Sequence, residues 1–236
     1  LGVIMYIRHP WVVGNAGILG TLVIIVIAHV ISISTGLSIS SIATDKNVGP
    51  GGIYYILSRS LGIPIGGAIG LTLYIGTAFS IALYLIGFAE SFNGYFGFDT
   101  GINGLRITGS MALIVLTGIA LISTSVALKT QFFILAAIVV SLVSIFLGTH
   151  DFAPETITAL ASEDSVPLEV VFAIFFPAVT GFTAGIAMSG DLKNPKKDIP
   201  IGTIASISVG FIVYVVLAIF LVNYVDSETL KSDYNI

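Results

Sequence analysis

Long apolar runs, separated by short polar stretches, restrict what this chain can fold into. Seven such runs cover residues 1–16, 17–43, 64–92, 105–127, 130–148, 167–189 and 201–225. A helix that spans a bilayer needs about 20 mainly apolar residues. The strands of a membrane barrel would appear as much shorter, alternating segments. The pattern therefore predicts an all-α integral membrane protein with about seven transmembrane helices. Because the run 1–16 is short for a span, we expect the chain to begin inside its first helix.

Composition excludes the soluble alternative, a helical bundle with an unusually apolar core. Charged residues make up 9% of the chain and hydrophobic residues 56%, whereas a soluble domain carries roughly 25% charged residues. With no cysteine, thiol catalysis and disulfides are excluded. No His, Asp and Glu cluster has metal-ligand spacing, and no nucleophile–base constellation supports an integral membrane enzyme. We expect neither an enzyme, nor a cofactor, nor a nucleic-acid partner.

Positive charges predict the orientation in the membrane. They gather in alternate connections, namely at Lys46, Arg59, Lys129, Lys193, Lys196 and Lys197. Such loops face the cytoplasm. Loops 44–63 and 190–200 are thus predicted to be cytoplasmic and the tail 226–236 to lie outside, in a plasma or cytoplasmic membrane.

The sixth run contains a helix-breaking pattern. Pro177 removes a backbone donor and clashes with the preceding turn, and Gly181 and Gly185 permit non-helical backbone nearby. Either this is a simple proline kink, or the helix breaks in the middle of the membrane. Unwound carbonyls would then attract a cation, and the N–H groups of the next half-helix would attract an anion. The residues alone leave both interpretations open.

A few polar side chains lie inside or at the ends of the runs. Arg8 and Glu90 are both predicted near the outer membrane boundary, where they either pair as an outer gate or reach the headgroups separately. We expect His9 to face an outer vestibule. His29 is expected to bond a neighbouring helix, with a proton relay as the alternative. Tyr84 lies within the third run, and its hydroxyl needs a partner if it is buried.

Several long stretches of the chain resemble the cation–chloride cotransporters, within the wider amino acid–polyamine–organocation permease superfamily. They are Gly2–Arg8, Trp11–Ile18, Thr35–Ser38, Ser41–Thr44, Gly51–Tyr55, Ser58–Gly62, Gly66–Leu71, Gly87–Glu90, Phe175–Gly181, Ser189–Leu192 and Ile199–Pro200. The resemblance implies a leucine-transporter-like fold of two inverted five-helix repeats, with helices one and six discontinuous. Residues 1–236 would then form one transmembrane transporter domain from a truncated helix one to helix seven, with the second repeat incomplete.

The same resemblance implies ion sites. Potassium would bind the Tyr84 hydroxyl, the Pro177 carbonyl and Thr180. One chloride would bind the N–H groups of Gly2, Val3 and Ile4, and a second those of Gly181, Phe182 and Thr183. Arg8 and Glu90 would form the outer gate, and no metal other than transported alkali cations is implied. Leu1 stands where sodium-coupled members have tryptophan, which leaves sodium dependence open.

We therefore expect a secondary active symporter that couples chloride with potassium, and sodium as an open third ion, by alternating access. An amino acid permease on the same fold is the main alternative, in which the helix-six N–H groups bind a substrate carboxylate. A channel is disfavoured because broken helices suit occlusion better than an open pore. The expected partners are the transported ions and the lipid bilayer, and a homodimer is left open.

Overall fold

Helices form all the regular structure among the residues that the computed structural model describes, which are 2–45, 51–122, 124–148, 166–187 and 189–232. In chain order they are α1 (Gly2–Ile7), α2 (His9–Asp45), α3 (Gly52–Leu61), α4 (Ile63–Phe96), α5 (Ile102–Ile122), α6 (Thr124–Leu147), α7 (Leu168–Phe175), the 3-10 turn η1 (Phe176–Val179), α8 (Thr183–Ala187), the 3-10 turn η2 (Ser189–Asp191), α9 (Pro195–Tyr224) and α10 (Ser227–Ser232). The predicted all-α class is confirmed.

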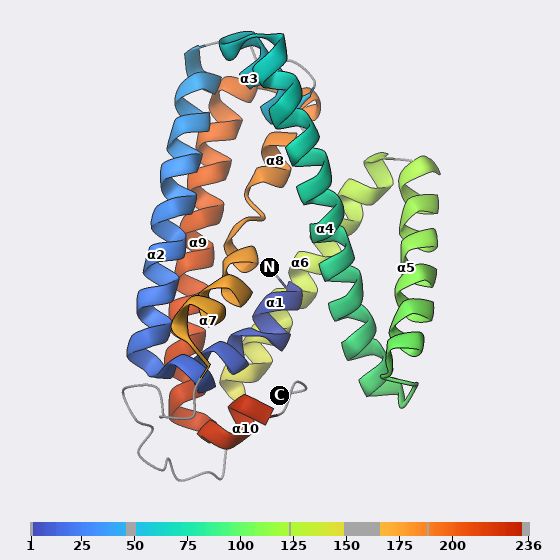
Figure 1. The fold of residues 1–236 in the computed structure, drawn as a ribbon, viewed down its shortest axis with the longest axis vertical. Coiled ribbons are helices and arrows are strands. Elements are labelled where there is room, and N and C mark those ends of the chain that lie inside the picture. Colours follow the sequence, from blue (N-terminus) through green and yellow to red (C-terminus); the bar gives the residue numbers. More distant parts are fainter. Residues whose placement is uncertain (1, 46–50, 123, 149–165, 188, 233–236) are drawn as a thin grey trace.

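Five of these helices are long and apolar enough to cross a membrane. They are His9–Asp45, Ile63–Phe96, Ile102–Ile122, Lys129–Leu147 and Pro195–Tyr224. The pair α2 and α9 runs side by side along its length, with α7 and α8 against it (Figure 1). Large apolar side chains on α4, α5 and α6 remain exposed, as expected for surfaces that contact lipid.

Gly17 separates the first two predicted runs inside α2. Its backbone, at φ 65° and ψ 175°, interrupts an otherwise continuous helical segment. This conformation is almost restricted to glycine. Backbone hydrogen bonds from Arg8 N–H to the Ile4 carbonyl and from Val12 N–H to the Arg8 carbonyl, both 2.9 Å, connect residues 9–16 to α1, while residues 18–45 form the next span. The predicted boundary between runs 1–16 and 17–43 is confirmed.

Two predicted connections are wrong in part, because they contain helix. The loop 44–63 includes α3, and the loop 190–200 includes the start of α9, six residues before the predicted position. Pro195 occupies the first turn of α9, where proline costs no hydrogen bond. The Asp198 carboxylate also accepts the Asn194 N–H at 2.9 Å, so this polar, proline-containing stretch can begin a helix.

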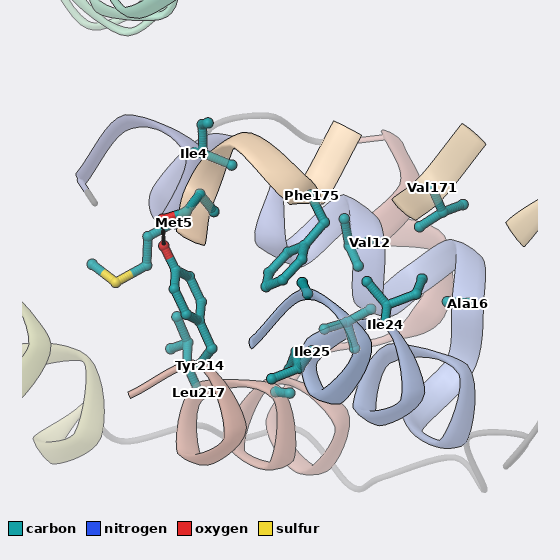
Figure 2. Packing of buried hydrophobic residues seen from close by; sticks show 14 of the residues in the cluster. Ile4, Met5, Val12, Ala16, Ile24, Ile25, Val171, Phe175, Tyr214 and Leu217 are labelled. Atoms are coloured by element: carbon teal, nitrogen blue, oxygen red, sulfur yellow. Dashed lines mark hydrogen bonds between the residues drawn. The ribbon is translucent and has the colours of Figure 1, made fainter. Parts of the chain in front are cut away.

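A compact cluster of buried side chains joins the N-terminal helices to the sixth predicted span. It includes Ile4, Val12, Ile25, Phe175 and Tyr214. Figure 2 shows Phe175 and Tyr214 directed into the space between α2, α7 and α9. The cluster positions the polar backbone described below, because Ala178 and Val179 also belong to it.

At the opposite end, α3 docks onto α8. The Gly52 N–H donates to Ser189 Oγ at 3.2 Å, and Ile56 packs with Ile186. A Cβ added to Gly52 would lie 2.7 Å from Ala187 Cα and 2.9 Å from the Ile186 carbonyl oxygen, and its φ is +55°. The approach of the two backbones thus depends on glycine at this position.

We expect Gly52→Ala to lower the melting temperature of the detergent-solubilised protein by several degrees. Overpacking of this kind costs about 1–3 kcal/mol, and each kcal/mol shifts the melting temperature by about 2–4 °C in a domain of this size. Fluorescence-detected size exclusion after heating measures the shift. Gly67→Ala is the matched control, because a Cβ there meets nothing within 4 Å. Equal melting temperatures for the two variants would contradict the proposed close contact.

Candidate functional site

The sixth predicted span is broken, which excludes the simple proline kink. The helix α7 ends at Phe175, the 3-10 turn η1 follows, and α8 begins only at Thr183. We call residues 176–182 the helix break. Pro177 lies in the first turn of η1. Because proline cannot donate to the preceding turn and clashes with it, the α-helix does not continue through this point.

The carbonyls of Pro177, Thr180 and Gly181 within the helix break accept local backbone donors, each three residues further along the chain. The Pro177 carbonyl accepts the Thr180 hydroxyl at 2.8 Å and the Thr180 N–H at 3.4 Å. The Thr180 carbonyl accepts the Thr183 hydroxyl at 3.1 Å. Two predicted potassium ligands, Pro177 and Thr180, are thus adjacent and bonded to each other.

The N–H groups that follow lead into α8. In the part of the chain that the structure describes, those of Gly181 and Phe182 have no backbone acceptor, and that of Thr183 donates to the Thr180 carbonyl at 3.4 Å. Gly181 is exposed, and Phe182 and Thr183 are half-buried. Unpaired N–H groups at the start of a helix favour an anion.

The helix α1 lies against the helix break. It contacts η1, and Ile4 is buried in the same cluster as Ala178 and Val179. Gly2, Val3 and Ile4 form the first turn of α1 as described. The predicted discontinuity near Gly2 involves Leu1, which lies outside the described residues. In Figure 1, α1 begins at mid-height beside the segment that joins α7 and α8.

Tyr84 lies on α4 and is half-buried. Its side chain packs against the cluster that contains Ala178 and Val179. Tyr84 therefore lies beside the cluster to which the helix break contributes Ala178 and Val179.

Arg8 and Glu90 lie together, from the α1–α2 junction and from α4. The guanidinium Nη2 is 3.1 Å from Oε2 and 3.4 Å from Oε1 of Glu90, and the side chains are 33% and 34% exposed. The alternative in which each charge reaches the headgroups separately is therefore wrong for this conformation.

Both histidines differ from expectation. His9 is buried rather than facing a vestibule, with Nε2 3.2 Å from the Tyr214 carbonyl oxygen. The apolar environment around Phe175 accounts for this, because aromatic rings cover the imidazole. His29 Nδ1 lies 2.8 Å from the Ile25 carbonyl of its own helix. Its contact with the neighbouring helix is a ring contact with Phe211 rather than a hydrogen bond.

Sequence reasoning missed two hydroxyls that reach the helix break. Ser32 of α2 donates to the Val179 carbonyl at 3.2 Å, and Tyr214 of α9 donates to the Ala178 carbonyl at 3.3 Å. Each is a polar residue within an apolar run, and that is the signal that could have identified them, since a buried hydroxyl needs a partner.

Known proteins match this chain along almost its whole length. A family model described as amino acid permease matches residues 1–234. The chain is 36% identical over 239 residues to solute carrier family 12 member 2 of Mus musculus, covering 92% of this chain and 20% of that protein.

Two further relatives give similar values. Solute carrier family 12 member 2 of Squalus acanthias is 38% identical over 233 residues, covering 90% of this chain and 20% of that protein. Solute carrier family 12 member 1 of Homo sapiens is 37% identical over 240 residues, covering 92% and 22%. The chain spans about a fifth of the length of the curated relatives that it matches.

Proposed function

This chain belongs to the amino acid permease family and, within it, to the cation–chloride cotransporters, and from this premise we propose that it forms part of a symporter for chloride and potassium. The leucine-transporter-like membrane fold follows from the family. Sodium remains an open third ion. The proposed mechanism is alternating access around a site in the middle of the membrane, and we propose a transporter rather than an enzyme.

The helix break is the observation that carries this proposal. It brings together oxygen atoms, which carry partial negative charge, and N–H groups, which carry partial positive charge. The Pro177 carbonyl and the Thr180 hydroxyl supply oxygen atoms 2.8 Å apart, and oxygen is the ligand type that alkali cations prefer. The next residues supply N–H groups that suit an anion. A cation and an anion bound at adjacent positions partly neutralise one another, and this gives a physical reason for coupled transport.

For potassium we propose Tyr84, Pro177 and Thr180 as ligands. The present bond between the Thr180 hydroxyl and the Pro177 carbonyl is compatible with this role. When a cation binds, the hydroxyl hydrogen can rotate away, so that both oxygens face the ion. The position of Tyr84 against the neighbouring cluster supports its inclusion.

For chloride we propose two sets of backbone N–H groups. The first set is Gly2, Val3 and Ile4 at the start of α1, and the second is Gly181, Phe182 and Thr183 before α8. The contact between α1 and η1 supports two anion positions near one cation position.

We propose that Arg8 and Glu90 form the outer gate, because their ion pair links α4 to the α1–α2 junction. One polar contact between the two proposed cytoplasmic loops supports the proposed orientation. Lys196 Nζ lies 3.4 Å from the Asp45 carbonyl oxygen, so residues of the two proposed cytoplasmic loops or their borders meet at one end. With this orientation, the tail after α9 is outside a plasma or cytoplasmic membrane. A homodimer remains a prediction.

The first test is rubidium uptake into proteoliposomes that contain the protein expressed from its complete coding sequence. We expect uptake of rubidium, a potassium substitute, to fall to near background when gluconate replaces chloride. Empty liposomes are the control for leakage. Chloride-independent uptake would contradict the coupling. Repeating the assay with and without sodium determines whether sodium is the third ion.

An amino acid permease is the second candidate, and the description of the matching family model favours it. The N–H groups of residues 181–183 would then bind a substrate carboxylate. A mixture of amino acids added to the same proteoliposomes distinguishes the two functions. Amino acid uptake without any rubidium uptake would favour the permease.

A further inference from the structure

Two buried hydroxyls from two different helices bond successive carbonyls of the helix break. Ser32 of α2 and Tyr214 of α9 are 3% and 0% exposed. Their hydroxyl oxygens lie 3.2 Å from the Val179 carbonyl oxygen and 3.3 Å from that of Ala178. Figure 2 draws the second bond at the tip of the Tyr214 ring. Neither bond is local, so each ties the break to a separate span.

These two carbonyls need partners because the helix is interrupted. In an unbroken α-helix, the Ala178 carbonyl would accept the Phe182 N–H and the Val179 carbonyl the Thr183 N–H. Here the Thr183 N–H donates to Thr180 instead, and the Phe182 N–H has no backbone acceptor among the described residues. Buried carbonyls left without donors are strongly unfavourable. The two hydroxyls therefore replace the missing backbone donors.

The neighbouring Pro177 carbonyl has no such partner from another helix among the described residues. Among the described residues, the donors to the Pro177 carbonyl come from Thr180, within the break itself. The carbonyls of residues 178 and 179 are thus fixed to α9 and α2, while the donors to the Pro177 carbonyl are the Thr180 N–H and the Thr180 hydroxyl, of which the hydroxyl can rotate away.

The Tyr214 hydroxyl is held firmly in place. The Tyr214 ring lies edge-on to Phe175 at 5.2 Å and to His9 at 5.3 Å between centroids. His9 also bonds the Tyr214 backbone carbonyl. With the side chain fully buried, the rotamer is fixed by packing on several sides, and the hydroxyl is preorganised toward Ala178.

We infer that Ser32 and Tyr214 are positioning residues for the cation site. By holding the Ala178 and Val179 carbonyls, they fix the direction of the adjacent Pro177 carbonyl and Thr180 hydroxyl without touching the ion. This inference rests on the proposed function, because it concerns the same potassium site.

The test measures rubidium uptake against rubidium concentration for Ser32→Ala and Tyr214→Phe in the proteoliposomes described above. We expect the half-saturating rubidium concentration to rise about threefold to tenfold, which corresponds to the loss of one ordinary hydrogen bond. The maximal rate per transporter should change less than twofold. Ser32→Thr, which keeps the hydroxyl, should stay near the wild-type value.

Matched controls remove a hydroxyl that does not reach the break. Ser34→Ala removes an exposed α2 hydroxyl bonded to the Val30 carbonyl of the same helix. Tyr74→Phe removes that of an α4 tyrosine that is 74% exposed. Both should keep the wild-type half-saturating concentration.

The outcomes separate the inference from the proposed function. Wild-type protein without chloride-dependent rubidium uptake would overturn the proposed function. Wild-type uptake together with unchanged half-saturating concentrations in Ser32→Ala and Tyr214→Phe would overturn the positioning role alone, including when only the maximal rate falls. If Ser32→Ala does not reach the membrane, Ser32→Cys replaces it, because its side chain is of similar size and a weaker donor. The same rise in half-saturating rubidium concentration is then expected, and an unchanged value overturns the positioning role.

Discussion

Reversing the charge of Arg8 is expected to remove at least about nine tenths of chloride-dependent rubidium uptake, and a second reversal at Glu90 is expected to restore a measurable part of it. In Arg8→Glu, two carboxylates would face each other where an ion pair now stands at 3.1 Å. Both groups lie near a low-dielectric membrane interior, where like charges are poorly screened. The α1–α2 junction and α4 would then separate at the end that we propose to be the outer one.

The double variant Arg8→Glu, Glu90→Arg recreates the pair with its charges exchanged. Contacting residues show coupling of about 0.5–3 kcal/mol in such cycles. We expect the double variant to exceed the Arg8→Glu variant in uptake per transporter by about threefold or more, which corresponds to ~0.7 kcal/mol. Uptake is normalised to the amount of reconstituted protein.

Arg106→Glu provides the control, because Arg106 is an exposed arginine of α5 on the same proposed side of the membrane. Its reversal changes the net charge equally and should leave uptake within about twofold of wild type, as is usual for an exposed charge. A double variant no better than the worse of its two single variants would show that the pair is not a functional unit.

The second large effect is expected at Gly17. Gly17→Ala would place a Cβ at φ 65° and ψ 175°, and a non-glycine residue in this region costs about 1–3 kcal/mol. The strain can be relieved by moving residues 2–16, which carry α1, Arg8 and His9. We therefore expect at least a tenfold loss of uptake, together with reduced recovery of folded protein.

Size-exclusion chromatography and rubidium uptake measure the two effects separately. Gly76→Ala and Gly118→Ala are suitable controls, since a Cβ at either position meets nothing within 4 Å and their φ angles are ordinary. Normal uptake and normal recovery for Gly17→Ala would mean that α2 tolerates another geometry at this point.

The sequence predicted the fold class and the helix break well, because both depend on local patterns. Apolar length alone identifies spans, and Pro177 with Gly181 disrupts a helix by covalent geometry. The pairing of Arg8 with Glu90 was also predictable, since charges at one membrane boundary have few other partners. The roles of these residues in ion binding and gating stay predictions.

Other features depend on tertiary packing and were not predicted. The sequence around His9 does not indicate that Phe175 and Tyr214 cover its side chain, because both lie more than 160 residues away in a chain of 236. The bonds of Ser32 and Tyr214 to the helix break likewise require the three-dimensional arrangement of α2, α7 and α9. In α3, by contrast, Ile53, Ile56 and Leu57 show helical spacing, so this helix could have been predicted from the sequence.

Because α3 docks onto α8, a label on the surface of α3 can report movements of α8, which is difficult to label directly. Ser60 is exposed on α3, so a fluorophore or spin label attached to a cysteine there would displace no buried side chain. The chain has no native cysteine to compete for the label. Because the Gly52 N–H is bonded to Ser189 beside α8, a spectroscopic signal from position 60 would follow α8, on the proposed cytoplasmic side, during turnover without any label in the proposed ion pathway.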